Sequence, residues 1–147
     1  MHMSLKADKN YGYGIVIDNL TFANNTKESP IINDGYNNIV QNCNFADNNV
    51  TPITSTGAGL QVINTTFSRN NASGEGNLSG GIYSNGTGLV VDNAVFVNNT
   101  AGNGASAIYL DEGSNVTSIA KSRFINGTGS AIIIFFIQWI IRNANFI

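Results

Sequence analysis

The sequence is poor in the residues that most often carry catalysis and metal binding. Its 147 residues include one cysteine, Cys43, and one histidine, His2. A single cysteine excludes an intramolecular disulfide and a thiolate metal site. A single histidine at the N-terminus excludes Ser–His–Asp and Cys–His nucleophiles and histidine-based zinc sites. We therefore assign no catalytic residue, no metal ligand and no cofactor from the sequence.

Charged residues are also scarce. Asp, Glu, Lys and Arg make up 11% of the chain, and the net charge is −2, whereas about a quarter of an ordinary globular domain is charged. This composition excludes a basic nucleic-acid surface and a polybasic membrane binder. No nucleic-acid partner is therefore expected.

Segments that would direct or anchor the chain are not found in the sequence. The N-terminus has no charged start followed by an apolar run, so no signal peptide lies in this chain. The most apolar segment, Ile132–Ile141, is ten residues long and includes Gln138, whereas a transmembrane helix needs about 20 residues. We expect no transmembrane helix, and we interpret the segment as buried strands, with a truncated membrane anchor as the alternative.

Turn-forming residues are abundant instead. The chain contains 24 Asn, 16 Gly, 12 Ser and 11 Thr, together 63 of 147 residues. These residues are poor helix formers and favour turns, so a helix-rich fold is excluded. Leu, Ile, Val and Phe total 41 residues, enough to build a core, which excludes a disordered chain. The composition indicates one all-β domain over residues 1–147.

A repeat centred on phenylalanine runs through the chain. Ile or Val stands five positions before each repeat Phe, a mostly small residue two positions before it, and Asn three positions after it in four of the six repeats. Successive repeats are 23, 22, 29, 28 and 22 residues apart. The repeat phenylalanines are Phe22, Phe45, Phe67, Phe96, Phe124 and Phe146. Three positions earlier the column holds Asn19, Asn42, Asn64, Asn93 and Asn143, with Lys121 in the fifth repeat.

Each column of the repeat has a physical interpretation. β-branched residues pack well on a pleated surface, so the Ile and Val column predicts an inward aliphatic ladder. Asn tolerates the left-handed backbone region, so the first Asn column predicts a corner whose side chains face inward. Stacked at the strand spacing of about 4.8 Å, these amides can bond one another. Phe fills the interior of the next strand, and the second Asn is expected to turn the chain again.

This pattern predicts a parallel β-solenoid of about five to six coils, each 22–29 residues long and incompletely capped. A leucine-rich repeat is excluded because only six leucines occur. A propeller blade needs about 40 residues. A β-sandwich remains the alternative, since short strands at regular spacing also suit it. The longer repeats are interpreted as insertions at one corner, over Ala72–Gly81 and Thr100–Ser106.

A third strand is expected after each Asn-rich corner, where small residues lead into an apolar pair at Gly80–Tyr83, Ser106–Tyr109 and Ser130–Ile133. Phe-x-x-Asn combined with Gly-Gly-aliphatic-(aliphatic or Tyr) resembles the repeat of chlamydial polymorphic outer-membrane proteins and of adhesin-like surface proteins of methanogenic archaea. The first motif occurs four times, and Gly80–Tyr83 matches the second well. Phe124 is followed by Gly127 instead of Asn, so a different corner is expected there.

The resemblance implies a right-handed parallel β-helix of the pectate-lyase-like class. It also implies a cell-surface or extracellular location and a non-catalytic adhesin-like or structural role, and it names no ligand. Expected partners are host or cell-surface glycans or proteins. Because solenoids need capping units and the sequence ends at Phe146–Ile147, we interpret the chain as a fragment of a longer repeat protein or one that associates end to end.

A carbohydrate-active enzyme of the same fold, a polysaccharide lyase or glycoside hydrolase, is the rival interpretation. Asp18 and Asp92 share one column, but three coils would place them roughly 14 Å apart, beyond the distance at which paired carboxylates hydrolyse glycosides. Asp111 and Glu112 are adjacent and are interpreted as a solvated turn, with a calcium ligand pair as the alternative. A β-helix spacer without any ligand is a third interpretation.

Two further features of the sequence, a tyrosine pair and a set of Asn-x-Ser/Thr tripeptides, concern the surface of the predicted solenoid. Tyr83 and Tyr109 are predicted to stack on neighbouring coils, either as exposed aromatic contacts for a ligand or as a pair that only stabilises the sheet. Ten Asn-x-Ser/Thr tripeptides occur, serving either as turns or as glycan acceptors. Asn77, Asn85 and Asn115 lie in the longer loops and are the better acceptors, whereas Asn19 and Asn64 are expected to face inward and accept poorly.

Overall fold

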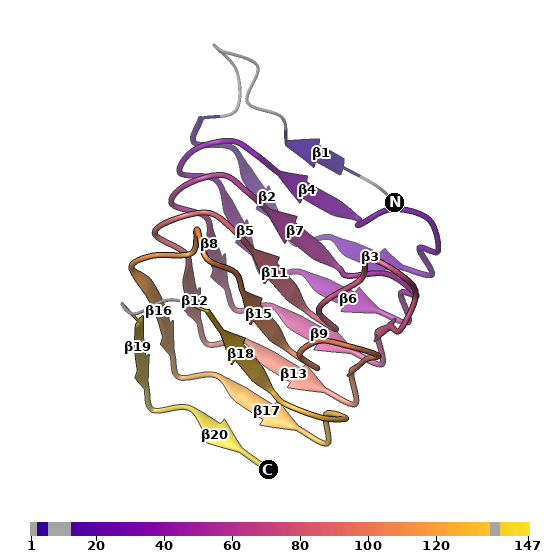
Figure 1. Cartoon of the computed structure of the whole chain (residues 1–147). Coiled ribbons are helices and arrows are strands. Elements are labelled where there is room, and N and C mark those ends of the chain that lie inside the picture. The colour runs from indigo at the N-terminus through magenta and orange to yellow at the C-terminus, as the bar shows by residue number, and fades with distance from the viewer. Residues whose placement is uncertain (1–2, 6–12, 136–138) are drawn as a thin grey trace.

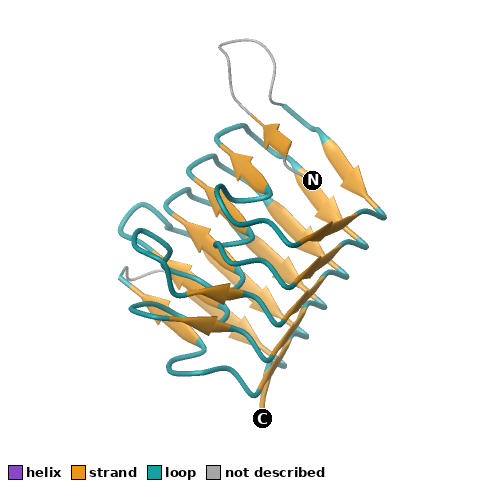
Figure 2. Ribbon diagram, turned by 90° about the vertical axis from the view of Figure 1, so that its right-hand side faces the viewer, coloured by secondary structure: helices purple, strands orange, loops and turns teal. Residues whose placement is uncertain are grey.

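The computed structural model describes residues 3–5, 13–135 and 139–147, and in them the chain winds as a solenoid of about five turns (Figure 1). Each turn contributes one short strand to each of three sheets, and all the strand pairs are parallel. Figure 2 shows the strands of successive turns stacked in rows and joined by loops. The prediction of a parallel β-solenoid is confirmed, and the β-sandwich alternative is wrong.

We number the sheets 1 to 3. Sheet 1 consists of β1 (Met3–Leu5), β4 (Ile31–Asn33), β7 (Ile53–Ser55), β11 (Ile82–Ser84), β15 (Ile108–Leu110) and β18 (Ile132–Ile134). Sheet 2 consists of β2 (Val16–Asp18), β5 (Ile39–Gln41), β8 (Gln61–Ile63), β12 (Val90–Asp92), β16 (Thr117–Ala120) and β19 (Trp139–Arg142). Sheet 3 consists of β3 (Thr21–Ala23), β6 (Asn44–Ala46), β9 (Thr66–Ser68), β13 (Val95–Val97), β17 (Arg123–Ile125) and β20 (Asn145–Phe146).

The longer repeats add a small sheet of their own. β10 (Asn71–Ala72) pairs with β14 (Thr100–Ala101) outside the three main sheets. Both strands lie where the sequence predicted insertions at one corner. The third strands predicted after the small-residue leads are β11, β15 and β18, so the apolar segment starting at Ile132 begins with a strand.

The core is a set of side-chain columns that run along the solenoid. The six repeat phenylalanines form one continuous stack, with neighbouring ring centroids 4.7–5.1 Å apart and planes within 1–10° of parallel. Beside them the aliphatic column is buried from Ile17 to Ile119, with at most 2% of any residue exposed. Because the apolar side chains of each turn cover those of the previous turn, burial of this column supplies the hydrophobic stabilisation of the fold.

The first predicted corner is confirmed in its backbone but not in its side chains. Every residue three positions before a repeat Phe has a φ of 48–57°, including Lys121. The side chains, however, are exposed from Asn19 to Asn143, so the expected inward orientation is wrong. A left-handed residue interrupts the alternation of a strand, so this residue and the one before it both point outward. The amides still form a ladder, since Asn64 donates to Asn42 at 3.3 Å and Asn93 donates to Asn64 at 2.5 Å.

The second corner lies one residue earlier than predicted. The left-handed residues stand two positions after the repeat Phe, with φ of 49–56° at Asp47, Arg69 and Asn126. The Asn column that follows does not turn the chain. It points inward, with Asn48, Asn70 and Asn99 at most 1% exposed. These buried residues and the half-buried Asn25 form a second amide ladder inside the solenoid, in which each Nδ2 from Asn25 to Asn70 donates to the next Oδ1 at 2.7–3.1 Å.

A third left-handed position precedes the strands of sheet 2. Glycine or Asn occupies it in the first four turns, and Val116 occupies it in the fifth with a φ of 58°. Val116 is 61% exposed. A β-branched residue is strained in this region, because its Cβ substituents approach the backbone.

The segment Ile132–Ile141 forms strands in its described part, but the expectation that they are buried is wrong: β18 is only half-buried, and Phe135 and Ile140 are exposed. β18 and β19 are the end strands of their sheets, so no described strand covers their outer side. Phe146 and Ile147 of the C-terminal coil are exposed as well. No helix in the described part of the chain is long and apolar enough to cross a lipid bilayer.

Candidate functional site

The acidic residues are dispersed over the surface. Asp18 and Asp92 lie in the same outward column of sheet 2, with the β5 and β8 positions Gln41 and Ile63 between them. Three strand spacings separate the two carboxylates by roughly 14 Å. Asp92 lies 3.8 Å from the Lys121 amine. Within the described residues, no group of three or more His, Cys, Asp and Glu side chains could hold a metal ion.

Asp47 and Asp111 serve local structure. The Asp47 carboxylate accepts two hydrogen bonds from the Arg69 guanidinium, each 2.8 Å long, and these bonds hold the pKa of Asp47 below its usual range. Asp111 accepts a bond from the Glu112 backbone N–H at 2.9 Å and begins a turn. Asp111 also has a second partner, the hydroxyl of Tyr83.

The outward column of sheet 1 consists of aliphatic, aromatic and threonine side chains and contains no charged residue from β4 to β18. It runs Ile32, Thr54, Tyr83, Tyr109 and Ile133 in strict register across β4, β7, β11, β15 and β18. All five side chains are half-buried. Tyr83 and Tyr109 stack with centroids 5.7 Å apart, as the sequence predicted, and Phe135 packs on Tyr109 at 5.5 Å.

The stacking decides which parts of the rings a ligand can reach. Neighbouring strands are about 4.8 Å apart, less than the width of an aromatic ring, so adjacent rings stack face to face and turn their edges outward. Tyr109 therefore has a neighbour on each side. Tyr83 has Tyr109 on one side and, in register on the other, Thr54. The threonine side chain is too short to cover a phenol ring, which leaves one face of Tyr83 open.

Tyr83 is held in place by its hydroxyl. The phenol donates to Asp111 Oδ2 at 2.7 Å. Burial, the hydrogen bond to Asp111 and the negative charge of that carboxylate raise the pKa of Tyr83 to about 12. The ring is thus fixed at both ends, by the β11 backbone and by a charge-assisted hydrogen bond.

A groove with a volume of about 490 Å³ opens beside this face of Tyr83. Its floor is the outward column of sheet 1 at Ile32, Thr54 and Tyr83. One wall is the loop 27–29, which precedes β4, and the other includes residues 76–78 of the inserted loop before β11. Ser29 and Thr54 share a hydrogen bond of 2.7 Å across the floor.

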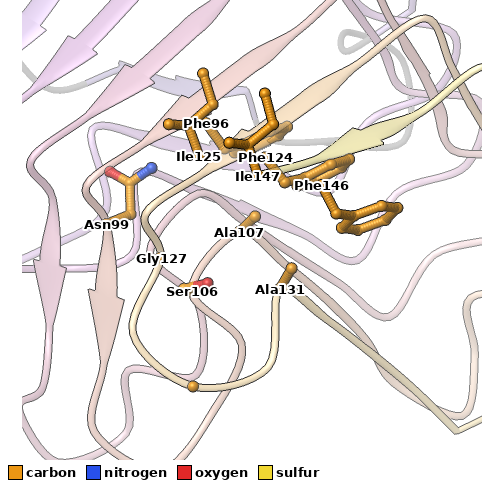
Figure 3. Close-up of a pocket in the computed structure, with 11 residues that line it drawn as sticks. Phe96, Asn99, Ser106, Ala107, Phe124, Ile125, Gly127, Ala131, Phe146 and Ile147 are labelled. Carbon is orange, nitrogen blue, oxygen red and sulfur yellow. The ribbon is translucent and has the colours of Figure 1, made fainter.

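A second cavity, of about 260 Å³, lies at the C-terminal end of the core. Figure 3 shows Phe124 and Phe146 on one side of it and Ala107 and Ala131 on the other. The buried amide ladder stops here because Gly127 replaces the next Asn. A Cβ at position 127 would collide with the Ser106 side chain. The prediction that this corner is built differently is wrong for the backbone, because Asn126 has the left-handed φ of 49° found at the other corners; only the inward amide is missing.

The predicted glycan acceptors differ in their surroundings. Asn85 and Asn115 are exposed, and the Oδ1 of Asn85 accepts the Gly113 N–H at 2.7 Å. Asn77 is half-buried in the groove wall, and its Oδ1 accepts the Thr51 N–H at 3.0 Å. Asn19 and Asn64 were expected to face inward but are exposed. Whether any of them carries a glycan stays a prediction.

Sequence reasoning identified Tyr83 and Tyr109 but missed the groove and the bond to Asp111. The groove walls are loops that share no column with the repeat, and only the wall at residues 76–78 belongs to an inserted segment. The signal for Asp111 was available, because Tyr109 lies one coil after Tyr83 in register and Asp111 follows Tyr109 by only two residues. One coil length thus brings Asp111 beside Tyr83.

Comparison with known proteins identifies the fold family. No curated protein and no solved structure shows significant similarity to the chain. The family described as the right-handed β-helix region matches residues 7–146. Together with the parallel three-sheet solenoid, this match shows that the chain belongs to the right-handed β-helix family.

Proposed function

We propose that this chain is a non-catalytic, adhesin-like binding domain of the cell surface, and that it contacts its partner through the outward face of sheet 1. The observation that carries the proposal is the Tyr83–Tyr109 stack beside the groove. Aromatic side chains that combine an apolar body with a polar tip are enriched where proteins bind partners. The cell-surface location rests on the resemblance of the Phe-x-x-Asn repeat to surface-protein repeats.

The architecture supports a binding role because a solenoid presents its outward columns as long, regular surfaces. Sheet 1 carries the Tyr83–Tyr109 pair and the groove, whereas the outward column of sheet 2 that contains Asp18 and Asp92 interleaves acids with Gln41 and Ile63. Each turn contributes one outward side chain to such a face. Binding through this face requires no cluster of catalytic residues.

The test is binding by the purified chain to an array of glycans and of the matrix proteins collagen, fibronectin and laminin. Thr54→Glu places a charge in the centre of the sheet 1 face. Thr66→Glu is the matched control, because Thr66 is also a half-buried, outward threonine, on β9 of sheet 3. We expect the wild type and Thr66→Glu to bind the same array components and Thr54→Glu to lose them.

Two results would overturn the proposal. Equal binding by the two glutamate variants would place the contact elsewhere, and an array without any bound component would remove the binding role. Turnover is measured in parallel with polygalacturonate and alginate, by reducing-end release and by ultraviolet absorbance of unsaturated products. Product formation in either assay would favour the carbohydrate-active enzyme instead.

A further inference from the structure

We propose that the groove beside Tyr83 binds one neutral pyranose ring of a glycan, stacked on the face of Tyr83 that turns toward Thr54. This inference rests on the proposed binding function and names its ligand class and contact. It also changes the role expected of the tyrosine pair: Tyr109 supports the stack, and Tyr83 alone offers a ring face to a ligand.

The open face of Tyr83 is the first element of the site. A pyranose ring presents axial C–H groups on one side, which pack on an aromatic face much as another ring would. The phenol is already fixed by its 2.7 Å bond to Asp111. Because the ring is ordered before the ligand arrives, binding does not have to order it, and less affinity is lost.

Polar groups around the groove match the hydroxyls of a sugar. Thr54 and Ser29 contribute hydroxyls at the floor. The Asn77 amide is oriented by the Thr51 N–H that binds its Oδ1, which leaves Nδ2 as its donor group. The volume of about 490 Å³ lies within the range of about 300–1,000 Å³ that small-ligand sites occupy.

The charge of the lining favours a neutral ligand. One cation, Lys27, and one anion, Glu28, line the groove side by side, so their charges offset each other. An acidic polysaccharide would need an excess of Lys or Arg, which this groove does not present among its lining residues.

An extended peptide fits this site less well than a sugar. Peptides that bind sheets usually add a strand to an exposed edge, where backbone groups are unpaired. The floor strands β7 and β11 each pair with a strand on both sides, so the groove offers no free edge. Recognition here depends on side chains, which are one ring face, hydroxyls, an amide, the aliphatic Ile32 and Leu78, and the offsetting pair Lys27 and Glu28.

The experiment is saturation-transfer difference NMR on the full chain with three probes: methyl β-D-glucopyranoside, methyl β-D-galactopyranoside and methyl α-D-mannopyranoside. We expect at least one probe to receive saturation, strongest on the C–H protons of one ring face. Tyr83→Phe keeps the ring face and should keep binding. Tyr83→Ala removes it and should weaken binding about tenfold, since one aromatic stack contributes up to about that factor.

Thr54→Phe is the most specific variant. A phenylalanine at this position extends the aromatic column and covers the open face of Tyr83, so binding should fall at least about tenfold while the fold is kept. Ile133→Phe is the matched control, because it introduces the same side chain in the same column at its other end, away from the groove. Far-UV circular dichroism and thermal melts establish that both variants fold.

Each outcome decides the inference. Loss of binding in Thr54→Phe with retention in Ile133→Phe supports it. Equal binding by these two folded variants, or no saturation of any probe, overturns it. The array result decides the proposed function separately: binding to matrix proteins that is sensitive to Thr54→Glu, without any glycan bound, would keep the binding face and overturn the sugar as its ligand.

Discussion

Replacing Asn70 with alanine tests whether the buried amide ladder stabilises the solenoid. The Asn70 Oδ1 accepts the backbone N–H and the amide Nδ2 of Asn48, at 3.0 and 2.9 Å. Its own Nδ2 donates to the Phe45 carbonyl at 3.0 Å and to Asn99 Oδ1 at 3.1 Å. Asn70 is 1% exposed, so water cannot replace these partners without opening the core.

The magnitude follows from what Asn70→Ala leaves behind. Two N–H donors of Asn48 lose their acceptor, and Asn48 itself is fully buried. A buried donor without a partner costs about 1–3 kcal/mol, so we expect a loss of about 4 kcal/mol in the free energy of unfolding. Since domains of this kind are stable by about 5–15 kcal/mol, this single change would remove a large part of the total.

The measurement is equilibrium unfolding in urea, followed by far-UV circular dichroism. Asn64→Gly is the matched control, because it removes an amide from the exposed ladder and keeps a residue suited to the left-handed φ of 48°. We expect it to cost less than about 1 kcal/mol, since solvent replaces exposed hydrogen bonds at little net cost.

A loss below about 1 kcal/mol for Asn70→Ala, equal to that of Asn64→Gly, would refute the reasoning. Asn70→Asp adds a second test. Its carboxylate cannot donate to Phe45 or Asn99, and burial raises the pKa of the introduced group. Its neutral form is therefore favoured in the folded state, and the variant should be relatively most stable below the unfolded pKa of about 4 and lose stability as the pH rises above it.

Three further predictions address other parts of the molecule. In urea unfolding, Val116→Gly should raise the free energy of unfolding by about 0.5–1 kcal/mol, because it relieves the strain at φ 58°; Val116→Ala should not raise it, and a loss of stability with glycine would contradict the strain. In ultraviolet titration, the difference between wild type and Tyr83→Phe should show a phenol ionising near pH 12, and Asp111→Asn should lower that pKa. Because the folded pKa is raised above the unfolded value of about 10, the stability from Tyr83 is complete below pH 10 and is lost toward pH 12. Cys43 is 3% exposed and burial raises its thiol pKa, so iodoacetamide should modify it only in urea, and fast reaction of the native chain would contradict its burial.

Much of the fold was predictable because a solenoid repeats its contacts. Each turn places its core residues on those of the turn before, so the Phe and aliphatic columns appear in the sequence at coil-length spacing, from Ile17 and Phe22 onward. The corner before each Phe was predictable as well, since Asn is the residue that best tolerates a left-handed backbone apart from glycine. Lys121 shows that the corner keeps its conformation even when Asn is replaced.

The directions of the two Asn columns were predicted wrongly, because Asn serves two different purposes. At a corner its backbone matters, and in the core its amide matters. The sequence does hold a signal that separates them. The true second corner tolerates Asp47 and Arg69, whereas the next position holds Asn in four successive repeats, Asn25 to Asn99. Where the side chain varies between repeats, the fold requires only the backbone conformation at that position. Where the same residue recurs in successive repeats, the fold requires its side chain.

The groove was beyond prediction because its walls lie outside the repeat. Residues 27–29 and 76–78 belong to connections of different lengths, and no column relates one to the other. Loop paths follow from local turns and from packing against the sheet, and the periodic pattern contains neither.

The aromatic site itself follows from one geometric constraint. On neighbouring parallel strands, aromatic rings are closer together than they are wide, so a run of aromatic residues must stack and cover its own faces. Only a ring at the end of the run, next to a short side chain, can offer a face to a ligand. On sheet 1 that ring is Tyr83, and the short neighbour is Thr54. A longer aromatic column would therefore be a weaker binding site, which is why extending it at Thr54 should abolish binding and extending it at Ile133 should not.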